Sequence, residues 1–196
     1  MKNEFKFCPE CGSRNIKHYP GNGATEENPF TKKWTCPDCG FDLYCNVAAA
    51  CGAVIFDDDN NVLFEIRAKE PRKGYIVIPG GFIDANEKAE TAVVRECMEE
   101  TGLEVPPESV RFLCTNPNTY EYRNIVYKTC DIFFSVKLPE GQKVPDLFLK
   151  IRAQESEVAG ICIHRILSEK DVDDLPLAFP SAVGALKLWL SQNPAK

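Results

Sequence analysis

Residues 81–103 read GFIDANEKAETAVVRECMEETGL, and the chain is organised around this stretch. Ala, Val and Glu fill its second half, which is a composition that a helix accepts. Asn86 is of the type that caps helix N-termini, acidic residues follow it, and Gly102 is of the type that ends helices. We therefore predict a helix from about residue 87 to residue 101, with Asn86 as its N-cap.

Three carboxylates of this helix are expected to share one flank. At about 100° per residue, Glu96, Glu99 and Glu100 lie close together, beside an apolar stripe that includes Val93 and Cys97. No lysine lies among them to relieve their mutual repulsion, so a divalent cation is a natural partner. Carboxylate oxygens suit magnesium (Mg²⁺) or manganese (Mn²⁺). The alternative is a solvated acidic face, which is the usual meaning of a run of charges.

The complete pattern resembles that of a known family. Residues 81–103 match Gly-x5-Glu-x7-Arg-Glu-U-x-Glu-Glu-x-Gly-U, the Nudix box, at every fixed position, where U is an apolar residue. The least usual choice is Cys97, because larger aliphatic residues are common at the first U. The resemblance implies an α+β fold, the Nudix α/β/α sandwich with a mixed sheet, and a hydrolase that cleaves diphosphate linkages.

The resemblance also implies roles for the acidic residues. Glu96, Glu99 and Glu100 match the ligands of Mg²⁺ or Mn²⁺, and Glu96 matches the position that serves as the base in several members. Family members often add a glutamate from beyond the box. Glu157 is the candidate by its place before the last predicted strand, and Glu155 competes with it. The alternative is that both of these are solvated loop charges.

Arg95 and Glu87 complete the catalytic set of the box. They lie eight residues apart, about two helical turns, so an ion pair between them would brace the loop against the helix. The two histidines of the chain, His18 and His164, are poorly placed to act as bases. Proton transfer is therefore expected to fall to a carboxylate or to a metal-bound hydroxide.

Residues around the box are candidates for contacts with a substrate. Gly80 and Gly81 allow the backbone to turn sharply into the box, which only glycine does without strain. Phe82 matches the phenylalanine of a Pro-Gly-Gly-Phe motif that stacks on a substrate ring in the NADH-cleaving branch of the family. A core aromatic beside the sheet is the alternative. Tyr120 and Tyr122 are further candidates for stacking on a base.

The N-terminal segment contains two similar cysteine motifs, FKFCPECGS at residues 5–13 and WTCPDCGF at residues 34–41. Paired thiolates on a tight turn can bind one ion, and two such turns complete a tetrahedral zinc site. Four sulfur ligands leave no open position, so the zinc is expected to be structural. The ligands are Cys8, Cys11, Cys36 and Cys39. We predict a zinc ribbon over residues 1–45 and a Nudix hydrolase domain over residues 46–196.

The composition is that of a globular protein without a broad basic surface. The chain has 196 residues, of which 44% are hydrophobic, and a net charge of -6. This balance argues against binding to nucleic acid or to an anionic membrane. Residues 47–56, the longest apolar run, are too few to span a bilayer, and the N-terminus has no apolar signal region. We expect a cytoplasmic homodimer in which the ribbon is structural or forms the dimer contact.

Local patterns predict the remaining elements. Apolar and β-branched runs indicate strands, clusters of Asp and Asn indicate turns, and an apolar period of 3.6 residues indicates a helix. The predicted strands are 47–56, 62–68, 110–116, 126–138 and 157–166, with a turn at 57–61, a polar connection at 118–124 and a closing helix at 179–192. The core-facing residues of that helix are expected to be Val183, Leu186, Trp189 and Leu190. This order favours a mixed sheet between helices.

The order of the motifs is similar to that of one branch of the family. A cysteine ribbon, an apolar strand, a hairpin, Pro-Gly-Gly-Phe and the box follow one another as in NADH pyrophosphatases. That branch carries a signature rich in Pro, Trp, Phe and Ser after the box, whereas residues 116–122 read NPNTYEY. We therefore predict Mg²⁺-dependent cleavage of a nucleoside diphosphate derivative of the ADP-ribose or dinucleotide type. The products are a nucleoside monophosphate and a phosphorylated fragment.

Three alternatives stay open beside this prediction. They are an NADH pyrophosphatase, a non-catalytic nucleotide-sensing binding protein, and a protein that recognises RNA 5′ ends through its ribbon. The complete set of glutamates disfavours a pure binding protein, because binding alone does not need all of them. The acidic balance disfavours RNA.

Overall fold

The computed structural model of the chain describes residues 6–22, 24–25, 30–122, 125–149, 151 and 156–194. Contacts between residues divide the chain into two units. One unit comprises Met1–Val47 and Tyr120–Lys128, and the other comprises Ala48–Thr119 and Thr129–Lys196. Within the described part of the chain, no helix has the length and apolar character needed to cross a membrane.

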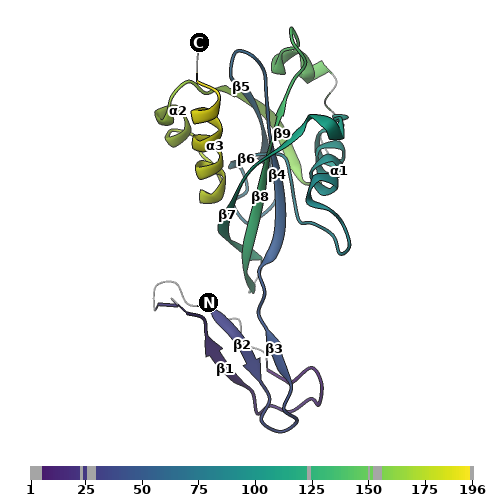
Figure 1. The fold of residues 1–196 in the computed structure, drawn as a ribbon, viewed down its shortest axis with the longest axis vertical. Helices are drawn as coiled ribbons and strands as arrows, with labels where there is room; N and C mark the ends of the chain where they lie inside the picture. Colours follow the sequence, from purple (N-terminus) through teal and green to yellow (C-terminus); the bar gives the residue numbers. More distant parts are fainter. Residues whose placement is uncertain are drawn as a thin grey trace. The chain divides into compact units, whose positions relative to one another are not determined.

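The first unit contains a small three-stranded antiparallel sheet (Figure 1). Its strands, in spatial order, are β1 (Lys17–Pro20), β2 (Thr31–Thr35) and β3 (Asp42–Tyr44). Trp34 of β2 is buried and donates its indole N–H to Sγ of Cys45 at 3.1 Å. The sequence analysis did not predict these strands, because they are short and lack an alternating apolar pattern.

The larger sheet is a mixed six-stranded sheet with the order β6-β5-β4-β8-β7, in which β9 pairs with β5. Its strands lie in the second unit, except for the parts of β7 and β8 within Tyr120–Lys128. β4 runs parallel to β8, whereas β5 runs antiparallel to β6 and β9. The strands are β4 (Ala48–Phe56), β5 (Asn61–Arg67), β6 (Ile76–Val77), β7 (Val110–Tyr122), β8 (Ile125–Lys137) and β9 (Val158–Arg165). The helices are α1 (Ala89–Thr101), α2 (Glu169–Asp173) and α3 (Pro180–Gln192), with the 3₁₀ segments η1 (Pro107–Ser109) and η2 (Val144–Leu149).

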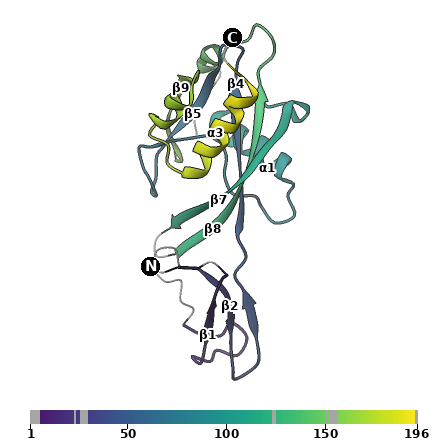
Figure 2. The same ribbon diagram turned by 60° about the vertical axis from the view of Figure 1, so that its left-hand side comes forward.

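Helices cover both faces of this sheet (Figures 1 and 2). Successive residues of a strand point to opposite faces. Phe56 of β4 accordingly packs in the apolar cluster that contains α3, and its neighbour Ile55 packs in the cluster that contains α1. The predicted core face of the closing helix is confirmed, since Leu186, Trp189 and Leu190 are buried and Val183 packs against the same cluster. The predicted α/β/α sandwich with a mixed sheet is therefore confirmed.

Helix α1 begins later than predicted. Its first residue is Ala89, the N-cap position is Lys88 without a side-chain cap, and Asn86 has a φ of 68° in the preceding turn. The prediction that Asn86 caps the helix was therefore wrong. The reason is that Glu87 accepts the backbone N–H of Asp84 at 3.1 Å and is held in the loop. The predicted end is confirmed, because Gly102 is the C-cap in the left-handed conformation.

Strand β7 is longer than predicted. It continues to Tyr122, so the prediction of a polar connection was wrong for residues 118–122, and residues 123 and 124 lie outside the described residues. The side-chain amide of Asn118 donates to Asp131 of β8 at 2.9 Å, which satisfies a polar residue across the two strands. The other predicted strands are present, with ends that differ by at most one residue.

Candidate functional site

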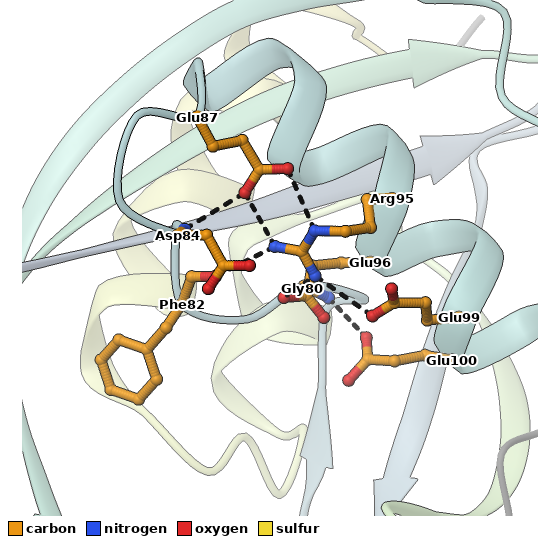
Figure 3. A network of polar contacts seen from close by, with 8 residues as sticks. All are labelled: Gly80, Phe82, Asp84, Glu87, Arg95, Glu96, Glu99 and Glu100. Carbon is orange, nitrogen blue, oxygen red and sulfur yellow. Dashed lines mark hydrogen bonds and ion pairs between the residues drawn. The ribbon is translucent and has the colours of Figure 1, made fainter.

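Arg95 links the loop before α1 to the helix, as the spacing predicted. Its Nε donates to Oε1 of Glu87 at 3.0 Å and its Nη2 donates to Oε2 of Glu87 at 2.9 Å. Nη2 also donates to the backbone carbonyl of Phe82 at 3.2 Å, as Figure 3 allows the reader to follow. The guanidinium lowers the pKa of Glu87, so this carboxylate stays ionised. A forked ion pair of this kind fixes the loop in one position.

The same guanidinium also holds two of the predicted metal ligands. Nη1 of Arg95 donates to Oε1 of Glu96 at 2.8 Å and to Oε2 of Glu99 at 3.1 Å (Figure 3). The side chain of Glu96 is largely covered, with 12% exposed, whereas that of Glu99 is 52% exposed. Arg95 therefore supplies the positive charge that these two carboxylates face in the structure.

Glu100 lies deeper than its two neighbours. It is 8% exposed, and its Oε2 accepts the backbone N–H of Gly80 at 2.8 Å. The pKa of Glu100 is raised to about 7, mainly by burial. The hydrogen bond from the N–H of Gly80 lowers this pKa, and the negative charge of Glu96 raises it. Burial likewise raises the pKa of Glu96, although Arg95 acts in the opposite direction. The site thus concentrates carboxylates where an added positive charge would be stabilising.

Two glycines make this close packing feasible. Gly80 has a φ of 148°, and a Cβ atom there would collide with the backbone carbonyl of Cys51. A Cβ atom on Gly81 would lie 2.6 Å from Oε1 of Glu96. The backbone N–H of Cys51 donates to the carbonyl of Gly81 at 2.8 Å, so the loop runs directly beside β4. A side chain at Gly81 would displace the carboxylate of Glu96, and one at Gly80 would push the loop away from β4.

Glu157 lies within electrostatic reach of the site. Its charge is among the influences that raise the pKa of Glu96 and of Glu100. Its backbone carbonyl accepts the N–H of Ala68 at 2.9 Å, and its exposed carboxylate pairs with Lys69 at 3.5 Å. Glu155 lies outside the described residues. The role of Glu157 as the extra acidic residue therefore stays a prediction.

The three residues predicted to stack on a substrate are Phe82, Tyr120 and Tyr122, and only Phe82 lies in the same unit as the carboxylates with its side chain described. Phe82 is 42% exposed, so the alternative of a core aromatic was wrong, and its ring points away from the carboxylates (Figure 3). Tyr120 belongs to the other contact unit. The side chain of Tyr122 lies outside the described residues. Their contacts with a substrate stay predictions.

The sequence analysis missed Glu65, which lies next to Glu100. Glu65 is 1% exposed in the middle of β5, and its carboxyl group is hydrogen-bonded to that of Glu100. Burial and the charge of Glu100 raise the pKa of Glu65 well above its ordinary value. The signal that was available is one acidic residue in the otherwise apolar run VLFEI at residues 62–66. A charged residue at such a position is rare unless it is paired.

The four predicted zinc ligands come together in the first unit. Their sulfur atoms all lie within 4.8 Å of one another, with 3.6 Å between Cys8 and Cys39 and 3.7 Å between Cys11 and Cys36. A tetrahedron with Zn–S bonds of about 2.3 Å has edges of about 3.8 Å. The two turns are also alike, because Gly12 and Gly40 each donate an N–H to the carbonyl of the first cysteine of their motif. The cluster is thus compatible with zinc.

The acidic cluster fits a hard divalent cation by donor type and charge. Every side-chain donor is a carboxylate oxygen, which is the donor that Mg²⁺ and Mn²⁺ prefer. One buried oxygen, Oε1 of Glu65, has no hydrogen-bond partner among the described residues. Within the part of the chain that the structure describes, these carboxylates do not form a close cluster of the kind that the cysteine sulfurs form, and Nη1 of Arg95 binds both Glu96 and Glu99. A divalent cation would compete with Arg95 for these oxygens.

Comparison with known proteins agrees with this geometry. Residues 47–184, more than half of the chain, match the model of the NUDIX domain. The chain is 28% identical over 178 residues to the NAD-capped RNA hydrolase NudC of Vibrio atlanticus, an alignment that covers 89% of this chain and 60% of that protein. It is 40% identical over 76 residues to the ADP-ribose pyrophosphatase of Methanocaldococcus jannaschii, with 39% of this chain and 44% of that protein covered. The chain thus spans only about half of the length of these relatives.

Solved structures show the same fold. The NUDIX hydrolase from Nitrosomonas europaea has a TM-score of 0.58 at 22% identity, with 97% of this chain and 96% of that chain covered. The NUDIX domain of Shewanella oneidensis NrtR, solved with ADP ribose, has a TM-score of 0.57 at 22% identity, with 75% of this chain and 88% of that chain covered. The complete box, the sandwich fold and the match over residues 47–184 together show that the chain belongs to the NUDIX family.

Proposed function

We propose that this protein is a hydrolase, dependent on Mg²⁺ or Mn²⁺, that cleaves the diphosphate linkage of a nucleoside diphosphate derivative. The substrate class is the ADP-ribose or dinucleotide type, and the products are a nucleoside monophosphate and a phosphorylated fragment. The observation that carries the proposal is that Glu96, Glu99 and Glu100 of α1 all contact groups beside one loop, Glu96 and Glu99 through Arg95 and Glu100 through the N–H of Gly80. Such a cluster is suited to a diphosphate, whose charge must be neutralised before it can be attacked.

Glu96, Glu99 and Glu100 would hold the cation. When bound, the cation neutralises charge on the diphosphate oxygens, polarises phosphorus and lowers the pKa of the attacking water. The backbone N–H of Gly80 orients Glu100. Glu157 is the candidate for a further acidic group, because its charge already reaches Glu96 and Glu100.

Glu96 is proposed as the group that takes the proton of the attacking water. Arg95 binds its Oε1, which leaves Oε2 for the proton. Burial raises the pKa of Glu96, which moves this carboxylate toward the range in which a base works at neutral pH. The exposed ring of Phe82 is the proposed stacking surface for a base of the substrate.

A panel of substrates tests this proposal. ADP-ribose, NADH, diadenosine compounds and nucleotide sugars are incubated with Mg²⁺ or Mn²⁺, and phosphate is measured after phosphatase treatment. The parent protein is expected to release phosphate from at least one compound, whereas Glu99→Gln is not. Glu90→Gln is the matched control, because Glu90 is an exposed residue on the same helix outside the cluster. If no compound is cleaved but one binds tightly, the non-catalytic alternative replaces this proposal.

A second candidate function is cleavage of NAD-capped RNA. The observation that favours it is the alignment with the NAD-capped RNA hydrolase NudC of Vibrio atlanticus, which covers 89% of this chain. The net charge of -6 disfavours it, since RNA binding by charge needs a basic surface. The two functions are separated by comparing kcat/KM for an RNA with a 5′ NAD cap and for ADP-ribose at two salt concentrations. Preference for the RNA at low salt would make it the main substrate.

We propose further that Cys8, Cys11, Cys36 and Cys39 bind structural zinc. In this proposal residues 1–45 form a separate zinc ribbon and residues 46–196 form the Nudix hydrolase domain. The ribbon gives the protein its homodimer contact, and the protein works in the cytoplasm. Zinc content, mass in solution and cell fractionation test these statements one by one. A folded protein that contains no zinc would contradict the structural zinc, and a monomer in solution would contradict the homodimer.

A further inference from the structure

Glu65 is a carboxyl group buried within the sheet of the second unit. It lies on β5 between two partners, Val77 of β6 and Ile161 of β9, and only 1% of it is exposed. Its side chain shares the face of Leu63, two residues earlier, and Leu63 packs in the cluster that contains α1. Glu65 therefore points from the sheet toward the helix that carries the box.

The partners of Glu65 do not satisfy it. Its carboxyl group lies within hydrogen-bonding reach of that of Glu100, and its Oε1 has no partner among the described residues. Glu96 adds a second negative charge nearby. Among the largest influences on Glu65, the one positive group is Arg67, whose Nε donates to the carbonyl of Pro71 and whose guanidinium lies over the ring of Phe179. The site thus has more acidic groups than its own cations can balance.

A purely structural role does not account for this arrangement. A buried carboxyl group without a full set of partners destabilises the fold, and an apolar residue of similar size would pack better in a central strand. A divalent cation changes this balance, because it is attracted by every carboxylate of the cluster. The acidic pair Glu65 and Glu100 then becomes part of the cation site instead of a defect.

We propose that Glu65 is a further carboxylate of the cation site, which holds Glu100 from the sheet side and strengthens the binding of Mg²⁺ or Mn²⁺. Glu65 acts through Glu100 and is a positioning residue. The inference rests on the proposed function, since it needs a cation at the box glutamates. It assigns to this site a residue of β5 that lies outside the box.

Binding of Mn²⁺ tests the inference without any substrate. Free Mn²⁺ is measured by electron paramagnetic resonance during titration of the parent protein, of Glu65→Gln and of the control Glu90→Gln. Glu65→Gln keeps the size of the side chain and can donate its amide to Glu100, but it removes one charge. We expect Glu65→Gln to raise the dissociation constant for Mn²⁺ at least threefold, whereas Glu90→Gln is expected to change it by less than threefold. A smaller effect of Glu65→Gln overturns the inference.

A second variant covers the case in which glutamine disturbs the core. Glu65→Leu is expected to melt at or above the parent temperature without added cation, and to lose most of the rise in melting temperature that Mn²⁺ gives the parent. A rise equal to that of the parent overturns the inference, and so does failure of both variants to fold. In the double variant with Glu100→Gln, the effect of Glu65→Gln on Mn²⁺ affinity is expected to shrink, because the two residues act together. A parent protein that binds no Mn²⁺ contradicts the proposed function itself.

Discussion

The backbone N–H of Gly80 donates a hydrogen bond to Oε2 of Glu100 over 2.8 Å and thereby ties the loop after β6 to the last turn of α1. The contact needs a glycine, since Gly80 has a φ of 148° and lies against the carbonyl of Cys51. It also fixes the one box glutamate that is buried. The position of the Glu100 carboxylate is thus coupled to the conformation of this loop.

The first prediction is that Gly80→Ala destabilises the protein by more than about 2 kcal/mol, because both the backbone conformation and the space for a Cβ atom are lost. Chemical denaturation measures this change. Gly160→Ala is the control, since its Cβ would meet only Ile66 at 3.5 Å and its backbone is not left-handed. Equal stability of the two variants would show that the loop adapts and that Gly80 is not required.

The second prediction is that Glu99→Gln and Glu100→Gln keep the fold but lower kcat by orders of magnitude. Loss of a carboxylate ligand misplaces the cation and removes its stabilisation of charge. Glu99 is half exposed, so its variant is expected to melt within a few degrees of the parent. Steady-state kinetics with saturating Mg²⁺ give the answer, with Glu90→Gln as the control. Activity above about a tenth of the parent in either variant would count heavily against the metal assignment.

The parts of this site that were predictable follow from fixed spacing. Glu87 and Arg95 lie eight residues apart, and the predicted ion pair exists with Glu87 in the loop and Arg95 on α1. Gly102 ends the helix because a left-handed residue costs glycine little. The spacing of residues within one short segment can be read from a sequence, so contacts that depend only on this spacing can be predicted.

Contacts between elements were not predictable in the same way. Asn86 looked like a cap, but the start of α1 is set by the hold of Arg95 and Asp84 on Glu87. Glu65 reads as one odd residue in an apolar strand, and only the packing of β5 against α1 reveals its contact with Glu100. Such pairs depend on how strands are ordered in the sheet, which no local pattern records.

The third prediction concerns the cysteine cluster. Cys36→Ser is expected to lose bound zinc and to unfold residues 1–45, while the core around α1 and α3 stays folded because the four cysteines take no part in it. Elemental analysis, limited proteolysis and mass in solution measure the zinc, the unfolding and the predicted homodimer. Cys130→Ser, outside the cluster, is the control. Loss of zinc with unchanged melting and unchanged mass would contradict a structural zinc.

The fourth prediction is a pH dependence of stability in protein without added Mg²⁺ or Mn²⁺. Burial raises the pKa of Glu100 from 4.5 to about 7, so between these values the folded protein keeps a proton that the unfolded chain has lost. Its contribution is therefore complete below about pH 4.5 and is lost as the pH rises through 7, by roughly 3 kcal/mol or less. The raised pKa of Glu65 acts in the same direction.

Urea unfolding between pH 5 and pH 8 checks this dependence. The free energy of unfolding is expected to fall as the pH rises, and saturating Mn²⁺ is expected to restore stability at pH 8. Glu100→Gln should flatten the slope, because its amide does not titrate. A free energy of unfolding that stays level or rises between pH 5 and pH 8 would contradict the raised pKa of Glu100 and Glu65 in the folded protein.

The last prediction concerns the choice of substrate. In the proposed function the bond that is cleaved is a diphosphate, and Phe82 offers an exposed ring for a base. The sequence after the box lacks the signature of NADH pyrophosphatases, so no recognised feature selects the nicotinamide half. ADP-ribose is therefore expected to be cleaved at least as efficiently as NADH, measured as kcat/KM for both under the same Mg²⁺ conditions. A preference for NADH of about tenfold, on the order of 1.4 kcal/mol in the transition state, would overturn this choice in favour of an NADH pyrophosphatase.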